Sequence, residues 1–376
     1  MLGSTGSIGT QALEVIGASE ELQAVGLAAG SAWEKAVEQA REHGVPVVAL
    51  ADESAAESAR GAWSGRVLSG EEGVRELIVS TEPDLVLNAV VGAAGLGSTI
   101  VALSEGIDVA LANKESLVLG GELVMALAEA TGARLLPVDS EHSALFQLIH
   151  GEAPGTVERL VLTASGGPFR GREDLSGVSV ADALAHPNWE MGGRITIDCA
   201  TLMNKGFEAI EAHHLFGVSY ERIGVVVHPQ SLIHSLIHLN DGSTLAHLGY
   251  PDMRVPISYA LNRPDRPPVA PAVDLAELGE LTFEAPDTDT FRCLRLAREA
   301  GIAGGSAPCA LNAADEVAVE AFLQGAIGFT AIPEVIVGVL EATDPQPFGH
   351  FEELFECDAR SRALAGELVS RIGAAA

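Results

Sequence analysis

Two carboxylates, Asp139 and Glu141, stand directly after an apolar run at residues 133–138. That run is predicted to be a buried strand, and a helical pattern begins at once after it. Open parallel sheets bind ligands at the carboxyl ends of their strands. Because residues two apart in a strand point the same way, the two carboxylates could share one cation. Oxygen ligands favour Mg²⁺ or Mn²⁺ over zinc. The alternative is that Asp139 caps the helix and Glu141 is a first-turn acid that favours its dipole.

A second candidate site lies at the start of the chain, where residues 2–9 read Leu-Gly-Ser-Thr-Gly-Ser-Ile-Gly before a helical pattern. A glycine turn between strand and helix frees backbone N–H groups to bind a pyrophosphate, although it can also be a plain glycine-rich turn. The next strand, at 22–29, ends without the acidic residue that would bind a ribose 2′-hydroxyl. This absence favours NADP, with Ser31, Ala32 and Lys35 nearest to a 2′-phosphate.

Lysine is rare in this chain, which makes the positions of Lys114 and Lys205 informative. Lys114 stands at a predicted helix start, where the helix dipole disfavours a cation, so an anionic ligand explains it better than local stability. Lys205 follows Asn204 and shares a helix face with Glu208, three residues on. The pair is either a simple i,i+3 ion pair or a phosphate-binding group beside a third metal-binding carboxylate.

A long connection without a regular pattern, at about 166–193, contains His186 and Trp189. Such connections are often active-site lids, and an Ω-loop on the surface is the alternative. Two further histidines, His228 and His234, belong either to the core or to the site, and only His234 is favoured for the site.

The elements that must position these residues alternate along the first half of the chain. Strands are expected at 45–51, 85–91 and 108–112, and helices at 34–42, 71–79, 96–104 and 122–129. This alternation predicts a doubly wound, Rossmann-like parallel sheet. Only Met1 and Leu2 precede the glycine turn, so we expect roughly four to six further residues upstream to complete a central strand.

After residue 150 the pattern changes to an α+β arrangement. Strands are expected at 158–163, 194–199, 222–228 and 243–248, with an alternating strand that ends at residue 239 and a helix from about 202. A proline-rich stretch at 262–272 opens a linker, and the remainder is helical, most clearly at 311–323, 332–340 and 359–372. The predicted domains are an NADPH-binding domain (1–139), a catalytic domain with the lid (140–262), a linker (263–289) and a helical domain (290–376).

Composition limits the partners of the protein. The formal net charge of −30 argues against a nucleic-acid partner, since no basic stripe could neutralise phosphates. No apolar run is long enough for a membrane helix, so no membrane partner is expected. The four cysteines show neither metal-binding spacing nor a CxxC motif, which fits a reducing cytoplasm.

Seven motifs occur together in the order found in the 1-deoxy-D-xylulose 5-phosphate reductoisomerase family, and the chain resembles that family over nearly its whole length. They are Gly-Ser-Thr-Gly-Ser-Ile-Gly, Ala-Asn-Lys-Glu-Ser, Pro-Val-Asp-Ser-Glu-His, Ser-Gly-Gly-Pro-Phe, His-Pro-Asn-Trp, Met-Asn-Lys-Gly-Phe-Glu and His-Pro-Gln-Ser-Leu-Ile-His. Leu-Asn-Ala-Ala-Asp-Glu at 311–316 extends the likeness into the helical end. The resemblance implies an NADP-dependent oxidoreductase of isoprenoid synthesis that converts 1-deoxy-D-xylulose 5-phosphate to 2-C-methyl-D-erythritol 4-phosphate. It also implies a homodimer that uses NADPH and Mg²⁺ or Mn²⁺, with Co²⁺ as a further candidate.

Carried over by position, the resemblance implies roles for particular residues. The metal ligands would be Asp139, Glu141 and Glu208. Catalytic groups would be Lys114, Glu141, His186, Trp189 and His234. Substrate contacts would come from Lys114, Ser140, Glu141, Ser165, His186, Cys199, Asn204, Lys205 and Glu208. The cofactor would contact Thr5, Gly6, Ser7, Ile8, Gly30, Ser31, Ala32, Asn113, Glu115 and Gly192.

Two departures from the family and two rival functions remain. One departure is the missing first strand, which affects the cofactor site. The family usually has serine where this chain has Cys199, and a thiol is a weaker donor to phosphate. A generic NADP-dependent semialdehyde or homoserine dehydrogenase would not need three carboxylates. A non-catalytic protein that senses the cofactor would bind NADPH without turnover.

Overall fold

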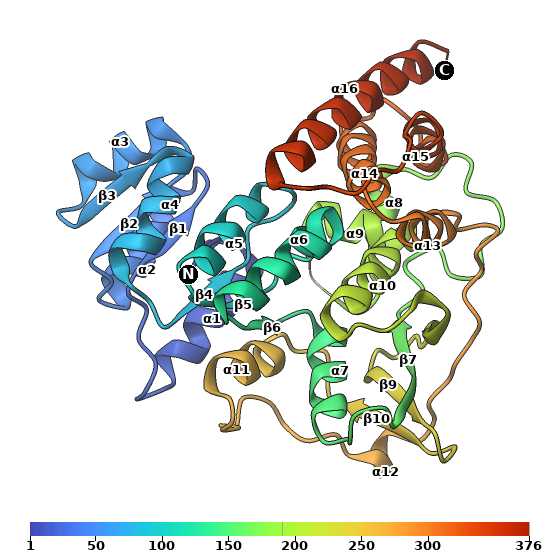
Figure 1. Cartoon of the computed structure of the whole chain (residues 1–376), viewed down its shortest axis with the longest axis horizontal. Helices are drawn as coiled ribbons and strands as arrows, with labels where there is room; N and C mark the ends of the chain where they lie inside the picture. The colour runs from blue at the N-terminus through green and yellow to red at the C-terminus, as the bar shows by residue number, and fades with distance from the viewer. Residues whose placement is uncertain (190, 376) are drawn as a thin grey trace. The chain divides into compact units, whose positions relative to one another are not determined.

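The computed structural model describes residues 1–189 and 191–375, which form two compact units. Unit 1 comprises Met1–Ser116, Val124–Ser143 and Asp252–Pro271. Unit 2 comprises Leu117–Leu123, Ala144–Pro251 and the chain from Ala272 onward. Each unit is described below by itself (Figure 1).

Unit 1 is built on a parallel sheet. Three strands pair in the order β1 (Leu27–Ala29), β2 (Val47–Leu50) and β3 (Arg66–Ser69), and three more in the order β4 (Leu85–Asn88), β5 (Asp108–Leu111) and β6 (Leu135–Pro137). Leu2 bridges Ala28 and Asn88 in parallel and so joins the two halves. Its N–H donates to Leu87 O at 2.9 Å, and its carbonyl accepts from Ala89 N at 3.0 Å. The doubly wound parallel sheet predicted from the sequence is confirmed.

Helices connect these strands, as parallel pairing requires. They are α1 (Ser7–Gly17), α2 (Trp33–Glu42), α3 (Glu53–Ala62), α4 (Gly70–Thr81) and α5 (Ala94–Ser104), with α11 (Arg254–Asn262) added from later in the chain. Helices α6 (Glu115–Thr131) and α7 (Ser140–His150) run through the boundaries between the two units. The sequence patterns do not predict α3, β3 or α11, and the strand expected at 22–29 is regular only over Leu27–Ala29.

Unit 2 carries a four-stranded mixed sheet in the order β10 (Thr244–Leu248), β9 (Ile233–Leu239), β7 (Val157–Ala164) and β8 (Ile223–Val227). Its helices and turns include α8 (Val180–Ala183), α9 (Gly193–Ala200), α10 (Met203–Phe216), η1 (Tyr220–Arg222) and α12 (Leu275–Leu278). The helical end consists of α13 (Cys293–Ala303), α14 (Ala307–Leu323), α15 (Ala331–Glu341) and α16 (Phe351–Ala375). Phe207, Leu311, Phe322 and Val335 belong to one buried cluster that joins α10 to these helices.

The strand predicted at residues 194–199 is wrong, because this segment is helix α9. Alternating Ile195 and Ile197 with Thr196 favour a strand locally. In the fold, Gly192 caps a helix instead, and its carbonyl accepts from both the N–H and the hydroxyl of Thr196, at 3.1 and 2.9 Å. Ile197 is fully buried in the cluster with α10 and α14, so tertiary packing overrides the local preference.

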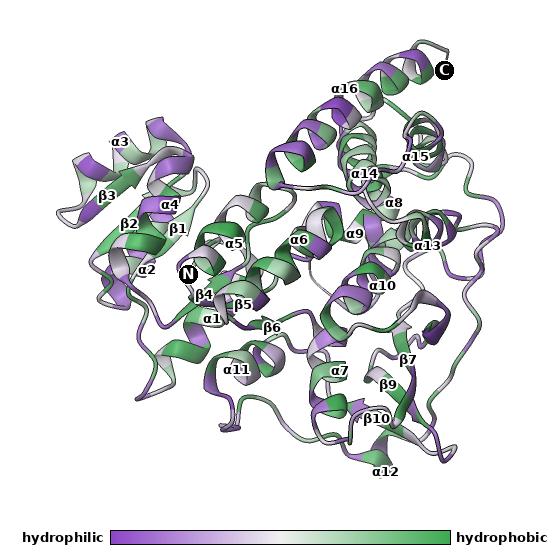
Figure 2. Cartoon of the chain, viewed as in Figure 1, coloured by the Kyte–Doolittle hydropathy of each residue, from purple (hydrophilic) through white to green (hydrophobic). Residues whose placement is uncertain are grey.

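The C-terminal helices show how the two faces of an amphipathic helix are used. Figure 2 shows hydrophilic and hydrophobic residues alternating along α16. Leu354, Cys357 and Ala365 of this helix are buried, whereas most of its charged residues are exposed. Within the described part of the chain, no helix is long and apolar enough to cross a membrane.

Candidate active site

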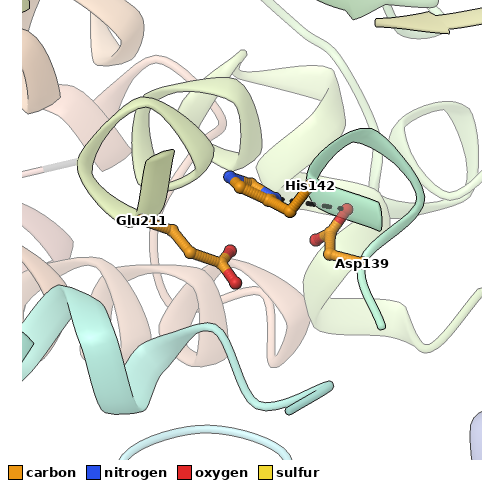
Figure 3. Close-up of side chains that lie close together, drawn as sticks. All are labelled: Asp139, His142 and Glu211. Atoms are coloured by element: carbon orange, nitrogen blue, oxygen red, sulfur yellow. Dashed lines mark ion pairs between the residues drawn. The ribbon is translucent and has the colours of Figure 1, made fainter. Parts of the chain in front are cut away.

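Asp139 follows β6 and forms an ion pair with Lys114, the residue that caps the N-terminus of α6. Lys114 Nζ lies 2.5 Å from Asp139 Oδ2, and both side chains are about nine-tenths buried. The ring of His142 approaches the other oxygen, with Nδ1 3.9 Å from Oδ1, as the dashed line in Figure 3 marks. Burial alone would raise the pKa of the Asp139 carboxyl, but the Lys114 ammonium and the His142 ring hold it well below its usual range. Asp139 is therefore an ionised carboxylate.

Glu141 reaches the same place from a helix and not from a strand. Strand β6 ends at Pro137 and α7 begins at Ser140, so the expected geometry of strand neighbours is wrong. Asp139 and Glu141 still bring carboxylate oxygens within 4.8 Å of each other. Ser140 Oγ donates to Glu141 Oε2 at 2.6 Å, which orients the Glu141 carboxylate. The result is a pair of oxygen donors at the carboxyl end of the sheet, where a divalent cation could bind.

The polar stretch that precedes Lys114 forms a buried network with the end of β4. Asn113 Nδ2 donates to Val90 O at 2.7 Å and to Gly92 O at 2.9 Å, and it also contacts Glu115 Oε2 at 2.9 Å. Gly95 must lack a side chain, because a Cβ there would lie 2.5 Å from Asn113 Cγ. The segments that follow β4 and β5 are thus joined in one rigid structure.

The glycine turn leads directly into α1. A Cβ at Gly9 would lie 2.3 Å from Gly3 O, so the helix packs tightly against the turn. Gly6 caps α1 without any side-chain hydrogen bond, and the first turn of α1 carries no acidic residue. Lys35 Nζ donates to Thr5 O at 2.9 Å, which places one ammonium beside the turn. Free helix N–H groups together with this positive charge suit the phosphates of a dinucleotide.

In unit 2, the first turn of α10 brings together the three polar residues predicted there. Lys205 Nζ lies 2.5 Å from Glu208 Oε2, and Asn204 Nδ2 donates to Glu208 Oε1 at 2.7 Å. All three side chains are buried, and the i,i+3 ion pair of the alternative interpretation is present. Burying charged groups costs desolvation free energy, so buried charges of this kind favour a function or a ligand at this position.

Ser165, at the end of β7, lies against the end of α9. Gly167 has φ of +69°, and a Cβ there would lie 2.7 Å from Cys199 O, so the loop after β7 touches the backbone of α9 directly. Ser165 Oγ lies 3.0 Å from His186 Nε2 and accepts from Gly167 N at 3.2 Å. Burial, and then the nearby Lys205 ammonium, lowers the pKa of His186 below its ordinary value. The predicted phosphate-binding residues of unit 2 therefore gather around one point.

Two further predicted residues lie beside each other on the same unit. The ring centroids of Trp189 and His234 are 6.4 Å apart, and His234 is buried between Trp189 and His247. His228 Nδ1 instead donates to Thr282 O at 2.9 Å, and the ring stacks on Phe283, which is a structural role. The preference for His234 over His228 at the site agrees with this arrangement.

Sequence analysis did not identify Arg194 as important, yet this residue ties the start of α9 to the helical end. Its guanidinium contacts Glu316 Oε1 at 2.9 Å and Asn312 Oδ1 at 3.3 Å. Arg194 Nη2 also lies 3.8 Å from Asp315 Oδ2. Burial and the neighbouring Asp198 carboxylate raise the pKa of the Asp315 carboxyl. The motif at 311–316 thus supports α9, the helix that follows the predicted lid. The sequence signal that could have revealed this contact is the motif at 311–316, whose polar residues lie in an otherwise apolar helix.

The predicted site residues fall into two groups. Unit 1 carries the cofactor candidates and part of the metal and substrate candidates: Thr5, Gly6, Ser7, Ile8, Gly30, Ser31, Ala32, Asn113, Lys114, Glu115, Asp139, Ser140 and Glu141. Unit 2 carries Ser165, His186, Trp189, Gly192, Cys199, Asn204, Lys205, Glu208 and His234. Glu190, within the predicted lid, lies outside the described residues.

Comparison with known proteins decides the family. The chain matches the family model of 1-deoxy-D-xylulose 5-phosphate reductoisomerase over residues 1–121. Models of C-terminal domains of the same enzyme match at residues 135–216 and 248–364. The reductoisomerase of Geobacillus kaustophilus is 51% identical over 377 residues, which cover 98% of this chain and 99% of that protein. The chain belongs to the 1-deoxy-D-xylulose 5-phosphate reductoisomerase family.

Other members of the reductoisomerase family agree in sequence and in structure. The reductoisomerase of Chloroherpeton thalassium is 50% identical over 96% of this chain and 95% of its own. A crystal structure of a reductoisomerase in complex with NADPH, fosmidomycin and magnesium has a TM-score of 0.93, at 39% identity, and the alignment covers 98% of this chain and 97% of that one. The enzyme from Zymomonas mobilis in complex with NADPH has a TM-score of 0.90 at 38% identity, covering 98% and 97%. The predicted family and fold class are confirmed, and a generic semialdehyde or homoserine dehydrogenase is not favoured.

Proposed function

We propose that this protein converts 1-deoxy-D-xylulose 5-phosphate to 2-C-methyl-D-erythritol 4-phosphate, using NADPH and a divalent metal ion. The observation that carries this proposal is the pair of carboxylate oxygen donors, Asp139 and Glu141, in a chain that matches the reductoisomerase family along its length. Solved relatives that contain NADPH and magnesium support the same cofactors for this chain. The substrate is a small phosphorylated sugar, and the carbon-skeleton rearrangement precedes the reduction.

The donor set fits a divalent cation of the Mg²⁺ or Mn²⁺ type. Asp139 and Glu141 offer carboxylate oxygens within 4.8 Å of each other, and the low pKa of Asp139 keeps that group charged without a cation. Family resemblance adds Glu208 as a third ligand. When bound, the ion supplies a Lewis acid for the adjacent oxygens of the hydroxyketone, and NADPH supplies the hydride.

The protein's own residues bind, orient and enclose the substrate. Lys205, Asn204, Ser165 and Cys199 bind the phosphate, because they combine one ammonium with short polar donors at the ends of β7, α9 and α10. Lys114 and Ser140 face the reacting oxygens. Trp189 covers the substrate and excludes water, which protects the aldehyde formed by the rearrangement until it is reduced.

The cofactor binds at the glycine turn. Gly6 and the free N–H groups at the start of α1 receive the pyrophosphate, and the Lys35 ammonium lies beside the turn, where it donates to Thr5 O. Asn113 and Glu115 are held by their network and line the nicotinamide end, together with Gly192. Gly30, Ser31 and Ala32 flank the adenosine ribose, where no acidic side chain repels a 2′-phosphate.

We also propose a homodimer in the cytoplasm, with no nucleic-acid or membrane partner. The family supports the dimer, and the absence of a disulfide among the described cysteines is compatible with a reducing compartment. Light scattering coupled to size-exclusion chromatography measures the oligomeric state directly.

One assay tests the proposed function. NADPH oxidation is followed at 340 nm after 1-deoxy-D-xylulose 5-phosphate is added, with Mg²⁺, with Mn²⁺ and after chelation. We expect oxidation that requires both the sugar phosphate and the metal. Oxidation that continues in a chelator would favour a metal-independent dehydrogenase, and binding of NADPH without turnover would indicate a sensing protein.

A further inference from the structure

Asn188 connects the turn at residues 186–189 to a second turn at residues 228–231. Its Nδ2 donates to Pro229 O at 2.6 Å and to Ser231 Oγ at 2.8 Å. A proline carbonyl can only accept, so the NH₂ end of the Asn188 amide must face it. The two turns are more than 40 residues apart in the sequence and are joined here by both hydrogens of one side chain.

The turn at residues 228–231 is a rigid support. Ser231 N–H donates to His228 O at 3.0 Å, and His228 N–H donates to Ala164 O at 2.7 Å. The His228 ring is tied to Thr282 O at 2.9 Å. Since Ala164 is the neighbour of Ser165, the support for Asn188 is also the support for a predicted phosphate-binding residue.

Ser231 keeps a costly backbone conformation at this contact. Its φ is +53°, a left-handed value that non-glycine residues rarely adopt. Glycine would relieve this strain but would lack the hydroxyl that accepts from Asn188. Strain of this kind persists where the surrounding contacts require it, and it often marks a functional position.

The inner side of the 186–189 turn fixes the state of His186. Backbone N–H groups of Asn188 and Trp189 both donate to His186 Nδ1, at 3.2 and 3.0 Å. Nδ1 must therefore be an acceptor, which places the ring proton on Nε2, the nitrogen that faces Ser165 Oγ at 3.0 Å. Ser165 Oγ thus accepts from His186 and from Gly167 N–H, and its own hydrogen remains available for donation to a phosphate oxygen.

We propose that Asn188 is a positioning residue of the reaction. Its carboxamide holds the 186–189 turn on the 228–231 support, so that Trp189 and the His186–Ser165 pair stand in place before the substrate phosphate arrives. This inference rests on the proposed function. It predicts that Asn188 contributes to substrate binding without touching the substrate.

The test compares Asn188→Ala with wild type in two measurements. In the NADPH oxidation assay we expect the KM for 1-deoxy-D-xylulose 5-phosphate to rise about tenfold, since two hydrogen bonds of ordinary strength are lost, while kcat changes about twofold or less. In the unliganded protein we expect faster chymotryptic cleavage after Trp189. A purely structural role would lower the unfolding temperature without separating KM from kcat.

Two further variants sharpen this result. Asn240→Ala is the matched control, because it removes a similar amide-to-carbonyl bond, to Gly155 O at 2.7 Å, in another part of unit 2. It should leave both measurements unchanged. Ser231→Ala should have a smaller effect than Asn188→Ala, and should add almost nothing to it in the double variant, since the contact is already lost.

Unchanged KM and unchanged cleavage in Asn188→Ala would overturn the proposal, as would full additivity with Ser231→Ala. Cleavage does not depend on turnover. If wild-type protein fails to oxidise NADPH with this sugar phosphate, the proposed function fails, while the cleavage rates still decide whether Asn188 holds the turn.

Discussion

Lys205 and Glu208 lie one turn apart on α10, with Nζ 2.5 Å from Oε2, and both side chains are buried. Glu208 is the proposed third metal ligand and Lys205 the proposed phosphate-binding cation. The two functions are therefore coupled within one helical turn, because a metal ion that takes the Glu208 carboxylate competes with Lys205 for it. Binding of the metal should leave the ammonium available for the substrate phosphate.

Removing one charge from the carboxylate set should abolish turnover while NADPH still binds. In Asp139→Asn or Glu208→Gln we expect kcat to fall by at least roughly 100-fold, since metal ligands matter more than the residues that orient them. NADPH affinity, measured by fluorescence titration, should change little, because the cofactor depends on the glycine turn. Glu221→Gln, at an exposed acid on the same unit as Glu208, is the control. Wild-type rates in either variant at low metal concentration would rule out the proposed ligands.

The thiol of Cys199 should weaken phosphate binding relative to a hydroxyl. Cys199→Ser should lower the KM for the sugar phosphate by about fivefold or less, which corresponds to one improved hydrogen bond of about 1 kcal/mol at most. Thermal unfolding measured in parallel should show no large change. An unchanged or higher KM would mean that position 199 does not contact the phosphate, or that neighbouring groups accommodate the thiol.

Acid should destabilise the 186–189 turn through His186. Burial and the Lys205 ammonium lower the pKa of His186 in the folded protein, whereas the unfolded chain has the ordinary value of about 6.5. Below that pH the unfolded state therefore binds the proton more readily, and stability falls until the pH passes the lower folded value. Protonation would also place a hydrogen on Nδ1, against the two N–H groups that now donate to it.

The check for this pH effect is His186→Asn, whose side-chain oxygen can still accept from the backbone but does not titrate. Unfolding temperatures are measured between pH 7.5 and 5.5. Wild type should lose more stability than the variant over this range. Equal losses would show that His186 does not titrate in this way.

The tight packing of the glycine turn should make Gly9 intolerant of any side chain. A Cβ at Gly9 would lie 2.3 Å from Gly3 O and 2.5 Å from Ser4 Cα, both backbone atoms that cannot move cheaply. We expect Gly9→Ala to destabilise the protein by about 1–3 kcal/mol and to weaken NADPH binding.

Gly61→Ala in α3 is the matched control for this substitution, because nothing lies within 4 Å of a Cβ there. Replacing a helical glycine by alanine at a position without steric contacts should raise the free energy of unfolding by about 0.5–1 kcal/mol. Urea unfolding measures both variants. If Gly9→Ala behaved like Gly61→Ala, the turn would be looser than the structure indicates.

Local sequence patterns are enough to predict the family, the alternating order of elements in the first half and the types of residue at the site. Charged and small residues at the ends of strands are conspicuous because the strands are apolar and lysine is scarce. Such local signals suffice for Asp139, Lys114 and the glycine turn, since each stands beside the element that carries it.

How these residues are arranged depends instead on contacts between distant parts of the chain. Residues 194–199 favour a strand locally, yet they form α9 because Ile197 packs on α10 and α14 and Arg194 is held by residues about 120 positions away. Glu141 reaches Asp139 from the first turn of a helix, and Asn188 finds its partners at Pro229 and Ser231. Contacts over such separations depend on how distant segments pack, and local sequence patterns carry no information about that packing.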